Sequence, residues 1–207
     1  MEQYNSHSRA VSSPIVLEGQ LRECYGRVVY SHKTHEKCAD ILLWWHSRFK
    51  WAQIILSAIT TAGLISVVFG DSKLGAVVSA IASVLLLALH AYTKDFDFAA
   101  LAQKHRRAAS DLWLIRERYL SLLTDLRMEG QDVERVRAER DKLLEELHAV
   151  YSGAPSTNFK AYKKAQKALQ RHEDMTFSDD EIDAFLPHEL KRTGPSRHYD
   201  ANLKVDE

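Results

Sequence analysis

Two long apolar runs interrupt an otherwise polar chain. They cover residues 51–69 and 74–92, and neither contains a formally charged residue. A helix of this length is about 28 Å long, which is close to the thickness of the hydrocarbon core of a bilayer, about 30 Å. Only residues 70–73 separate the runs, and these turn-forming residues include both charges of the block, Asp71 and Lys73. The pattern predicts a transmembrane helical hairpin.

A hairpin buried inside a soluble all-helical domain would show the same two runs, because a helix that is apolar on every side also fits a large protein core. The rest of the chain argues against this alternative. It holds nearly all of the 28 Lys+Arg and 28 Asp+Glu residues, and it is too polar and too short to enclose two such helices. We therefore expect an all-α membrane protein whose hairpin has the lipid bilayer as its partner.

Aromatic and basic residues flank the two runs. Trp44, Trp45 and Trp51 lie at the start of the first run and Tyr92 ends the second, and such amphipathic rings prefer the membrane interface. The nearest basic residues outside the runs are Arg48, Lys50, Lys94, Lys104, Arg106 and Arg107, against Lys73 in the turn. By the positive-inside rule, we expect both termini in the cytoplasm and the turn outside.

Apolar positions repeat at intervals of three and four residues on both sides of the hairpin. The upstream seam comprises Leu17, Leu21, Cys24, Val28, Ser31, His35, Cys38, Leu42 and Trp45. The downstream seam comprises Leu101, His105, Ala108, Leu112, Ile115, Tyr119, Leu122 and Leu126. This spacing predicts long amphipathic helices. Because they extend from adjacent ends of one hairpin, we expect the two seams to face each other as an antiparallel pair.

The part of the chain after Gly130 has weaker patterns. A third helix is predicted by Val133, Val136, Leu143, Leu147 and Val150, and it either folds back or extends. Residues 152–158 have the composition of a loop, and residues 160–172 predict a short basic helix whose lysines face either solvent or anionic lipid. Ser178 and Glu181 predict the start of an acidic helix that Pro187 ends.

These patterns divide the chain into six segments. We expect a flexible N-terminus over residues 1–14, a cytoplasmic amphipathic helix over 15–50, the transmembrane hairpin over 51–92, cytoplasmic helices over 93–150, short helices packing on this stalk over 151–192, and a mobile tail over 193–207. Because no proline follows Pro14 until residue 155, the first helix is expected to run nearly unbroken from the cytoplasm into the membrane.

Small residues recur every four positions inside the hairpin. The first run carries Ala58, Ala62 and Ser66, and the second carries Gly75, Ser79 and Ser83. Such stripes let helix backbones approach closely in lipid. They either pack the two helices on each other or, because two helices cannot enclose a pore alone, line a path between several protomers. The candidate pore-lining or helix-packing residues are Ser57, Thr61, Ser66, Gly75, Ser79, Ser83 and His90.

Composition and motifs exclude several other functions. The formal net charge is zero, whereas a nucleic-acid binder normally has a basic excess, so we expect no nucleic-acid partner. His32, His35 and Cys38 lie on one predicted helix, but no fourth ligand is evident and we predict no metal site. The chain shows no phosphate-binding glycine loop and no nucleophile elbow, so neither a cofactor nor an enzymatic activity is expected.

Four stretches resemble a known family. They are LLWWHSRFKWAQIILSAITTAGLIS (42–66), LGAVVSAIASVLLLALHAYTKDFD (74–97), AQKHRRAASDLWLIRERYLSLLTDL (102–126) and DDEIDAFLPHELK (179–191). In this order they resemble the SLATT family, bacterial two-transmembrane effectors associated with SMODS nucleotidyltransferases and SLOG nucleotide-sensing domains. The resemblance implies an inner-membrane effector of antiphage conflict systems, which forms a homo-oligomeric pore or disrupts the membrane after a nucleotide-derived signal.

The source of the signal and the conducting role are left open by the sequence. The sequence shows no synthase domain and no sensor domain. We therefore expect a separately encoded nucleotide synthase or nucleotide-sensing protein as a partner. The alternative function is a membrane-anchored sensor or scaffold that conducts nothing, since an anchor needs only the hydrophobicity of the two runs.

Overall fold

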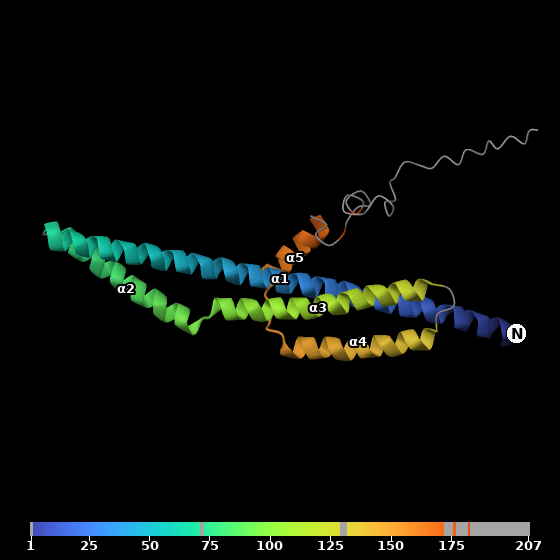
Figure 1. The fold of residues 1–207 in the computed structure, drawn as a ribbon. Helices are drawn as coiled ribbons and strands as arrows, with labels where there is room; N and C mark the ends of the chain where they lie inside the picture. Colours follow the sequence, from blue (N-terminus) through green and yellow to red (C-terminus); the bar gives the residue numbers. More distant parts are fainter. Residues whose placement is uncertain (1, 71–72, 129–131, 172–175, 177–181, 183–207) are drawn as a thin grey trace, which may run out of the picture. The chain divides into compact units, whose positions relative to one another are not determined.

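The described residues of the chain form five α-helices in a computed structural model (Figure 1). The structure describes residues 2–70, 73–128, 132–171, 176 and 182, and these ranges contain no strand. The helices are α1 (Glu2–Gly70), α2 (Lys73–Asp95), α3 (Phe98–Arg127), α4 (Val133–Gly153) and α5 (Phe159–Arg171). The chain divides into two compact units, Met1–Gln166 and Lys167–Glu207, of which the first contains α1 to α4 and most of α5.

Helix α1 is a single helix of 69 residues that contains both the upstream seam and the first helix of the hairpin. Its start differs from the flexible N-terminus expected for residues 1–14, because residues 2–14 are helical. Starting a helix is costly, whereas extending an existing one adds a backbone hydrogen bond for every residue that is ordered. A polar segment attached to a stable helix therefore continues it.

The chain returns along α1 as two separate helices, α2 and α3. Helix α2 ends at Asp95, and α3 begins with its own cap, since the backbone N–H of Ala100 donates to Asp97 Oδ1 at 2.8 Å. A side chain that caps a helix satisfies one of the backbone donors left free at its start. The return path is therefore interrupted at residues 96–97, opposite an unbroken α1.

The predicted antiparallel pair is present. Contacts join Glu18 to Arg127, His35 to His105, and Gln53 to Thr93, so α1 keeps one register against α3 and then α2. The largest side chains buried in the seam are those of Tyr119, Leu21, Leu112 and Val28, together with Leu143 and Cys38. Each such apolar side chain contributes about 1.5–3 kcal/mol by leaving water. The helices outside the hairpin are therefore held by a conventional apolar core.

Two seam positions differ from the prediction. Trp45 is 41 % exposed and Leu101 is 39 % exposed, and Ala102 lies in the seam in place of Leu101. The seam therefore starts with a step of three residues from Ala102 to His105, not with the predicted step of four. A small residue here brings α3 close to α1 just after the interruption of the return path.

Helix α4 folds back along α3, which decides between the two alternatives left open by the sequence (Figure 1). Val136 and Leu143 are buried against the seam. Arg118 on α3 forms ion pairs with Glu139 and Glu146 of α4. The part outside the hairpin is thus a three-helix arrangement of α1, α3 and α4 with apolar contacts inside and ion pairs at its edge.

Helix α5 confirms the predicted short basic helix. Asn158 caps it, because its Oδ1 accepts a hydrogen bond from the backbone N–H of Ala161 at 2.9 Å, and the Nδ2 of the same side chain lies 3.9 Å from Cys38 Sγ. Asn158 therefore joins the start of α5 to α1. The acidic helix predicted for residues 179–186 and the tail over 193–207 lie outside the described residues, apart from Ile182.

Candidate functional site: the membrane hairpin

The hairpin of α1 and α2 carries its large apolar side chains on the outside. Phe69 is 86 % exposed and Leu74 75 % exposed. The helical stretches Ile15–Gly70 and Lys73–Arg127 each contain a window apolar and long enough to cross a membrane, and the window in the first has no buried residue. A core helix of a soluble protein would be mostly buried. The exposed apolar surface therefore fits lipid and not the interior of a soluble domain.

Close contact between the two helices rests on glycine. A Cβ atom on Gly63 would lie 2.1 Å from Ser79 Oγ and 2.9 Å from the carbonyl oxygen of Gly75. A Cβ atom on Gly75 would lie 2.0 Å from Ser66 Oγ. Ser79 Oγ also donates to the carbonyl oxygen of Thr60 at 3.2 Å. The helices thus touch backbone to backbone, which is how small residues stabilise helix pairs in lipid.

A groove lies along the hairpin between its two helices, lined by polar and apolar side chains in equal number. It has a volume of about 810 Å³, and its polar lining consists of Lys50, Gln53, Ser57, Thr61 and His90. The hydroxyl of Thr61 donates to the carbonyl oxygen of Ser57 at 3.0 Å, so it is satisfied within its own helix. Hydroxyl, amide and imidazole groups therefore line one side of an otherwise apolar hairpin.

His90 has a defined tautomer in this groove when its ring is neutral. Its Nδ1 lies 3.0 Å from the carbonyl oxygen of Leu86. Because a carbonyl oxygen only accepts, Nδ1 carries the hydrogen, and Nε2 of the neutral ring is then an acceptor. The neutral ring thus has one acceptor nitrogen, two residues before the second run ends at Tyr92.

The predicted small-residue stripes correspond only partly to the observed helix contact. Ser66, Gly75 and Ser79 lie at the crossing, and Ser57, Thr61 and His90 line the groove. Ala58 and Ala62 also line the groove and do not form the crossing, and Ser83 is exposed. The residues at the helix contact that sequence reasoning missed are Gly63 and Ala82. Gly63 could have been found, because it is the glycine in the middle of the first run.

Aromatic rings surround the end of the hairpin opposite its turn. Phe49 stacks on Phe98 at a centroid distance of 5.3 Å and meets Tyr92 edge-on at 5.6 Å. Trp45 stacks on Phe49, and Trp44 meets Trp45 edge-on at 4.8 Å. These rings bridge α1 to the interruption between α2 and α3. They mark the level at which Trp and Tyr anchor a protein to the membrane surface.

Three histidines lie in the seam below this aromatic cluster. His35 Nδ1 and His105 Nδ1 are 3.0 Å apart, so one ring donates and the other accepts. Burial lowers the pKa of His35 to about 4, helped by repulsion from His105 and His32, and burial also lowers the pKa of His105. The seam therefore contains an uncharged histidine pair at neutral pH.

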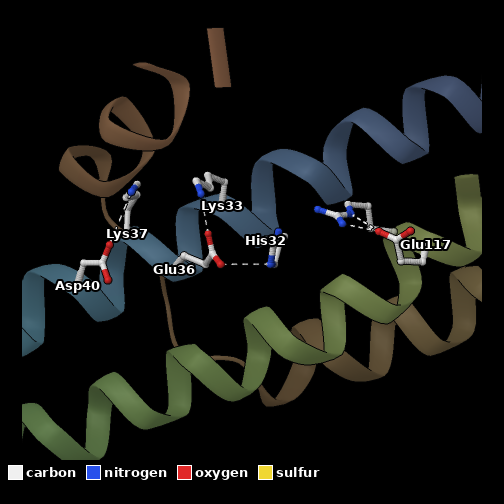
Figure 2. Close-up of polar contacts among 7 residues, drawn as sticks. His32, Lys33, Glu36, Lys37, Asp40 and Glu117 are labelled. Carbon is white, nitrogen blue, oxygen red and sulfur yellow. Dashed lines mark hydrogen bonds and ion pairs between the residues drawn. The ribbon is translucent and has the colours of Figure 1, made fainter. Parts of the chain in front are cut away.

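His32 lies one helical turn before His35 and faces charged neighbours (Figure 2). Its Nε2 is 3.6 Å from Glu36 Oε1, and Lys33 Nζ is 2.9 Å from the other oxygen of that carboxylate. Burial lowers the pKa of His32, against the attraction of Glu36. Its Nδ1 is buried and makes no hydrogen bond.

The structure does not combine the histidines and cysteines into a metal site. Within the described ranges, no three His, Cys, Asp or Glu side chains gather closely enough to hold a metal ion. His35 pairs with His105 across the seam, while Cys38 contacts Asn158. Burial raises the pKa of the Cys38 thiol, which keeps it protonated. The chemistry offered by these groups is therefore hydrogen bonding and proton uptake.

Comparison with known proteins identifies the family. No curated protein and no solved structure matches the chain. Residues 17–181 match the family described as SMODS and SLOG-associating 2TM effector domain family 4. The match covers both apolar runs and most of the helical stalk. The all-α fold and the two helices able to cross a membrane agree with this description. The chain therefore belongs to the SLATT family, as a two-transmembrane effector domain of family 4.

Proposed function

We propose that several copies of this membrane effector assemble in the inner membrane of a bacterium and that their hairpin grooves line a path across it. The observation that carries the proposal is the row of polar side chains, Gln53, Ser57, Thr61 and His90, in one groove of a hairpin whose exposed surface is otherwise largely apolar. A polar surface at this depth is unfavourable against lipid, and it is stabilised when it faces water or another protomer.

The orientation of the hairpin is part of the proposal. Basic residues outnumber acidic ones near both cytoplasmic ends of the hairpin, so both termini lie in the cytoplasm. The long helices then stand in the compartment where a nucleotide-derived signal is made or sensed. A separately encoded nucleotide synthase or nucleotide-sensing protein supplies that signal, as the associations in the family's description suggest. The protein itself acts without a catalytic step.

Transmission from the cytoplasmic helices to the groove follows from α1. The same helix carries His35 in the seam and Ser57 and Thr61 in the groove. A rearrangement of the seam therefore turns or shifts the groove-lining residues without an intervening joint. The outcome is a change in how neighbouring hairpins pack.

Dye release from liposomes that contain the purified protein tests the proposal. Candidate cyclic nucleotides and the cognate synthase products are added, and release is expected only with an activating signal. The double variant Ser57→Leu and Thr61→Leu removes the hydroxyls of the groove and is expected to reduce release at least tenfold. Ala88→Leu is the matched control, because Ala88 is exposed and lies two residues from both Leu86 and His90, on the opposite face of α2.

Three outcomes decide the question. Release by the wild type and by Ala88→Leu, but not by the groove variant, supports a path lined by the groove. Equal release by all three proteins excludes the groove as the path. A bilayer that stays tight under every signal that is toxic to cells contradicts pore formation and leaves the non-conducting anchor as the function.

A further inference from the structure

A cavity lies at the cytoplasmic base of the hairpin, between α1 and the start of α5. Its volume is about 330 Å³. Its lining consists of Asp40, Ile41, Trp44, Trp45, Lys160 and Lys164. Two tryptophans from the membrane-entry segment thus meet two lysines from a helix more than one hundred residues later in the chain.

We propose that this cavity binds the headgroup of an anionic phospholipid in the cytoplasmic leaflet. The ammonium groups of Lys160 and Lys164 bind the phosphate, and the rings of Trp44 and Trp45 lie against the glycerol region. The proposal rests on the membrane insertion and orientation proposed above, but it does not require that the protein conduct.

The membrane-facing end of the cavity lies just beyond the headgroup layer, within reach of it. Trp44 precedes Trp51, where the first apolar run begins, by seven residues, which corresponds to about 10 Å along a helix. The headgroup layer on each side of a bilayer is about 5–8 Å thick, and tilt of the helix shortens the vertical distance further. Lysine side chains bridge the remaining gap, since their long stems let the charged head reach the interface.

The two lysines are held in place by the docking of α5. Ala161 and Ala165 are fully buried, Asn158 contacts Cys38, and the rings of Tyr30 and Tyr162 are 6.0 Å apart. Lys160 and Lys164 follow one another by one helical turn and remain exposed. Residues spaced in this way have Cβ atoms about 5–6 Å apart. Two ammonium groups therefore converge on one site, where a phosphate oxygen accepts from both.

The charges around the cavity favour an anion. The only acidic lining residue is Asp40, and Lys37 Nζ lies 3.7 Å from its carboxylate. The guanidinium of Arg48 lies 5.4 Å from the centre of the Trp44 ring and adds a further positive charge beside the site. A zwitterionic headgroup brings its own cation to this region, whereas phosphatidylglycerol does not. The lining therefore discriminates by net charge.

Lipid binding to the full-length protein tests the inference. Native mass spectrometry of the detergent-solubilised protein measures the apparent dissociation constants for phosphatidylglycerol and phosphatidylcholine of equal chain length. We expect the wild type to prefer phosphatidylglycerol at least fivefold. The double variant Lys160→Gln and Lys164→Gln is expected to bind both lipids equally. The control variant Arg135→Gln and Lys142→Gln removes two exposed cations from α4 and should keep the preference.

Further arms separate the sources of the phosphate and the two proposals. Millimolar inorganic phosphate is expected not to displace phosphatidylglycerol, and displacement would assign the cavity to a soluble anion and overturn the lipid assignment. An unchanged preference in the Lys160→Gln and Lys164→Gln variant would also overturn it. Flotation with vesicles checks insertion of the same protein. Failure to float would overturn both proposals, whereas equal lipid affinities in wild-type protein that floats would overturn this one alone.

Discussion

The hairpin and the helices outside it pack in opposite ways. In the seam between α1 and α3, large side chains such as Leu112 and Tyr119 are buried between the helices and charged ones face outward. In the hairpin, Gly63 and Gly75 lie between the helices, while large side chains such as Phe69 and Leu74 face outward. Each arrangement suits its surroundings. In water, burial of apolar area stabilises the contact between helices, whereas in lipid it does not. The hairpin is therefore stabilised by close contact between the two backbones.

The comparison concerns a single helix. Helix α1 has large seam residues over its first part and small residues over its membrane part without any change in backbone structure. The same substitution is therefore expected to have opposite effects at two positions of α1. The following predictions test the two kinds of packing, in order of decreasing expected effect.

Removing a buried ring from the seam should have the largest effect. Tyr119→Ala leaves a cavity between α1, α3 and α4, and truncation of a buried aromatic side chain costs about 3–5 kcal/mol. Thermal unfolding of the detergent-solubilised protein, followed by far-ultraviolet circular dichroism, measures the loss. Leu120→Ala is the control, because Leu120 is 44 % exposed, and it should cost less than about 1 kcal/mol. Similar losses in both variants would show that the seam does not hold the helices together.

Acid should weaken the seam. The pKa of His35 is lowered to about 4 in the folded protein, so between pH 6.5 and 4 the unfolded chain binds more protons than the folded one. Stability is therefore complete above pH 6.5 and falls as the pH decreases towards 4, by about 3 kcal/mol from His35 alone. Thermal unfolding at a series of pH values measures the slope.

The double variant His35→Leu and His105→Leu should remove most of this pH dependence, because it replaces both rings of the pair with apolar side chains. The exposed His148 on α4 provides the control, and His148→Gln should unfold with the wild-type slope. A pH slope that persists in the double leucine variant would assign the effect to other groups.

Adding one methyl group should distinguish the two parts of α1. Gly63→Ala places a Cβ atom against Ser79 and the backbone at Gly75, and such overpacking costs about 1–3 kcal/mol. In Gly26→Ala, nearer the start of the same helix, the added Cβ atom meets no other atom within 4 Å. This variant should raise the free energy of unfolding by about 0.5–1 kcal/mol through helix propensity. Unfolding by titration with sodium dodecyl sulfate measures both. Destabilisation by Gly26→Ala equal to that of Gly63→Ala would refute the distinction.

Loss of the ion pairs between α3 and α4 should reduce the free energy of unfolding the least. Arg118→Gln removes the contacts of α3 with Glu139 and Glu146, and pairs of this exposure are worth about 0.2–1 kcal/mol. The loss should shrink in high salt. Arg137→Gln, which removes a pair within α4, provides the control and should leave the contact between α3 and α4 unchanged. Thermal unfolding at two salt concentrations checks both points, and a loss that does not depend on salt would indicate packing instead of charge.

The sequence was sufficient for the parts where polar and apolar residues contrast. The two runs are charge-free over a length that matches a bilayer, and seam positions such as Leu21, Val28 and Leu112 are buried as their spacing predicts. In these helices one face meets water and the other does not, so the buried apolar residues recur at regular intervals along the sequence.

The packing face of the hairpin could not be found in the same way. Apolar residues occur on every face of these membrane helices, so the face that meets its partner differs mainly in the size of its side chains, and small residues occur on several faces. Ala58, Ala62 and Ser83 therefore appeared equivalent to Ser66, Gly75 and Ser79. The direction of α4 was also undetermined, because the spacing of Val136 and Leu143 identifies a face but not which way the helix turns.

The unbroken backbone of α1 has a mechanical consequence. An α-helix without a joint behaves as a stiff rod under torsion, so a twist imposed on Leu21 or His35 rotates Ser57 and Thr61 through a similar angle. The return path has a two-residue gap between α2 and α3, where backbone torsion angles absorb such a twist. In the proposed function, a torque applied to the stalk reaches the bilayer through α1, which turns against α2.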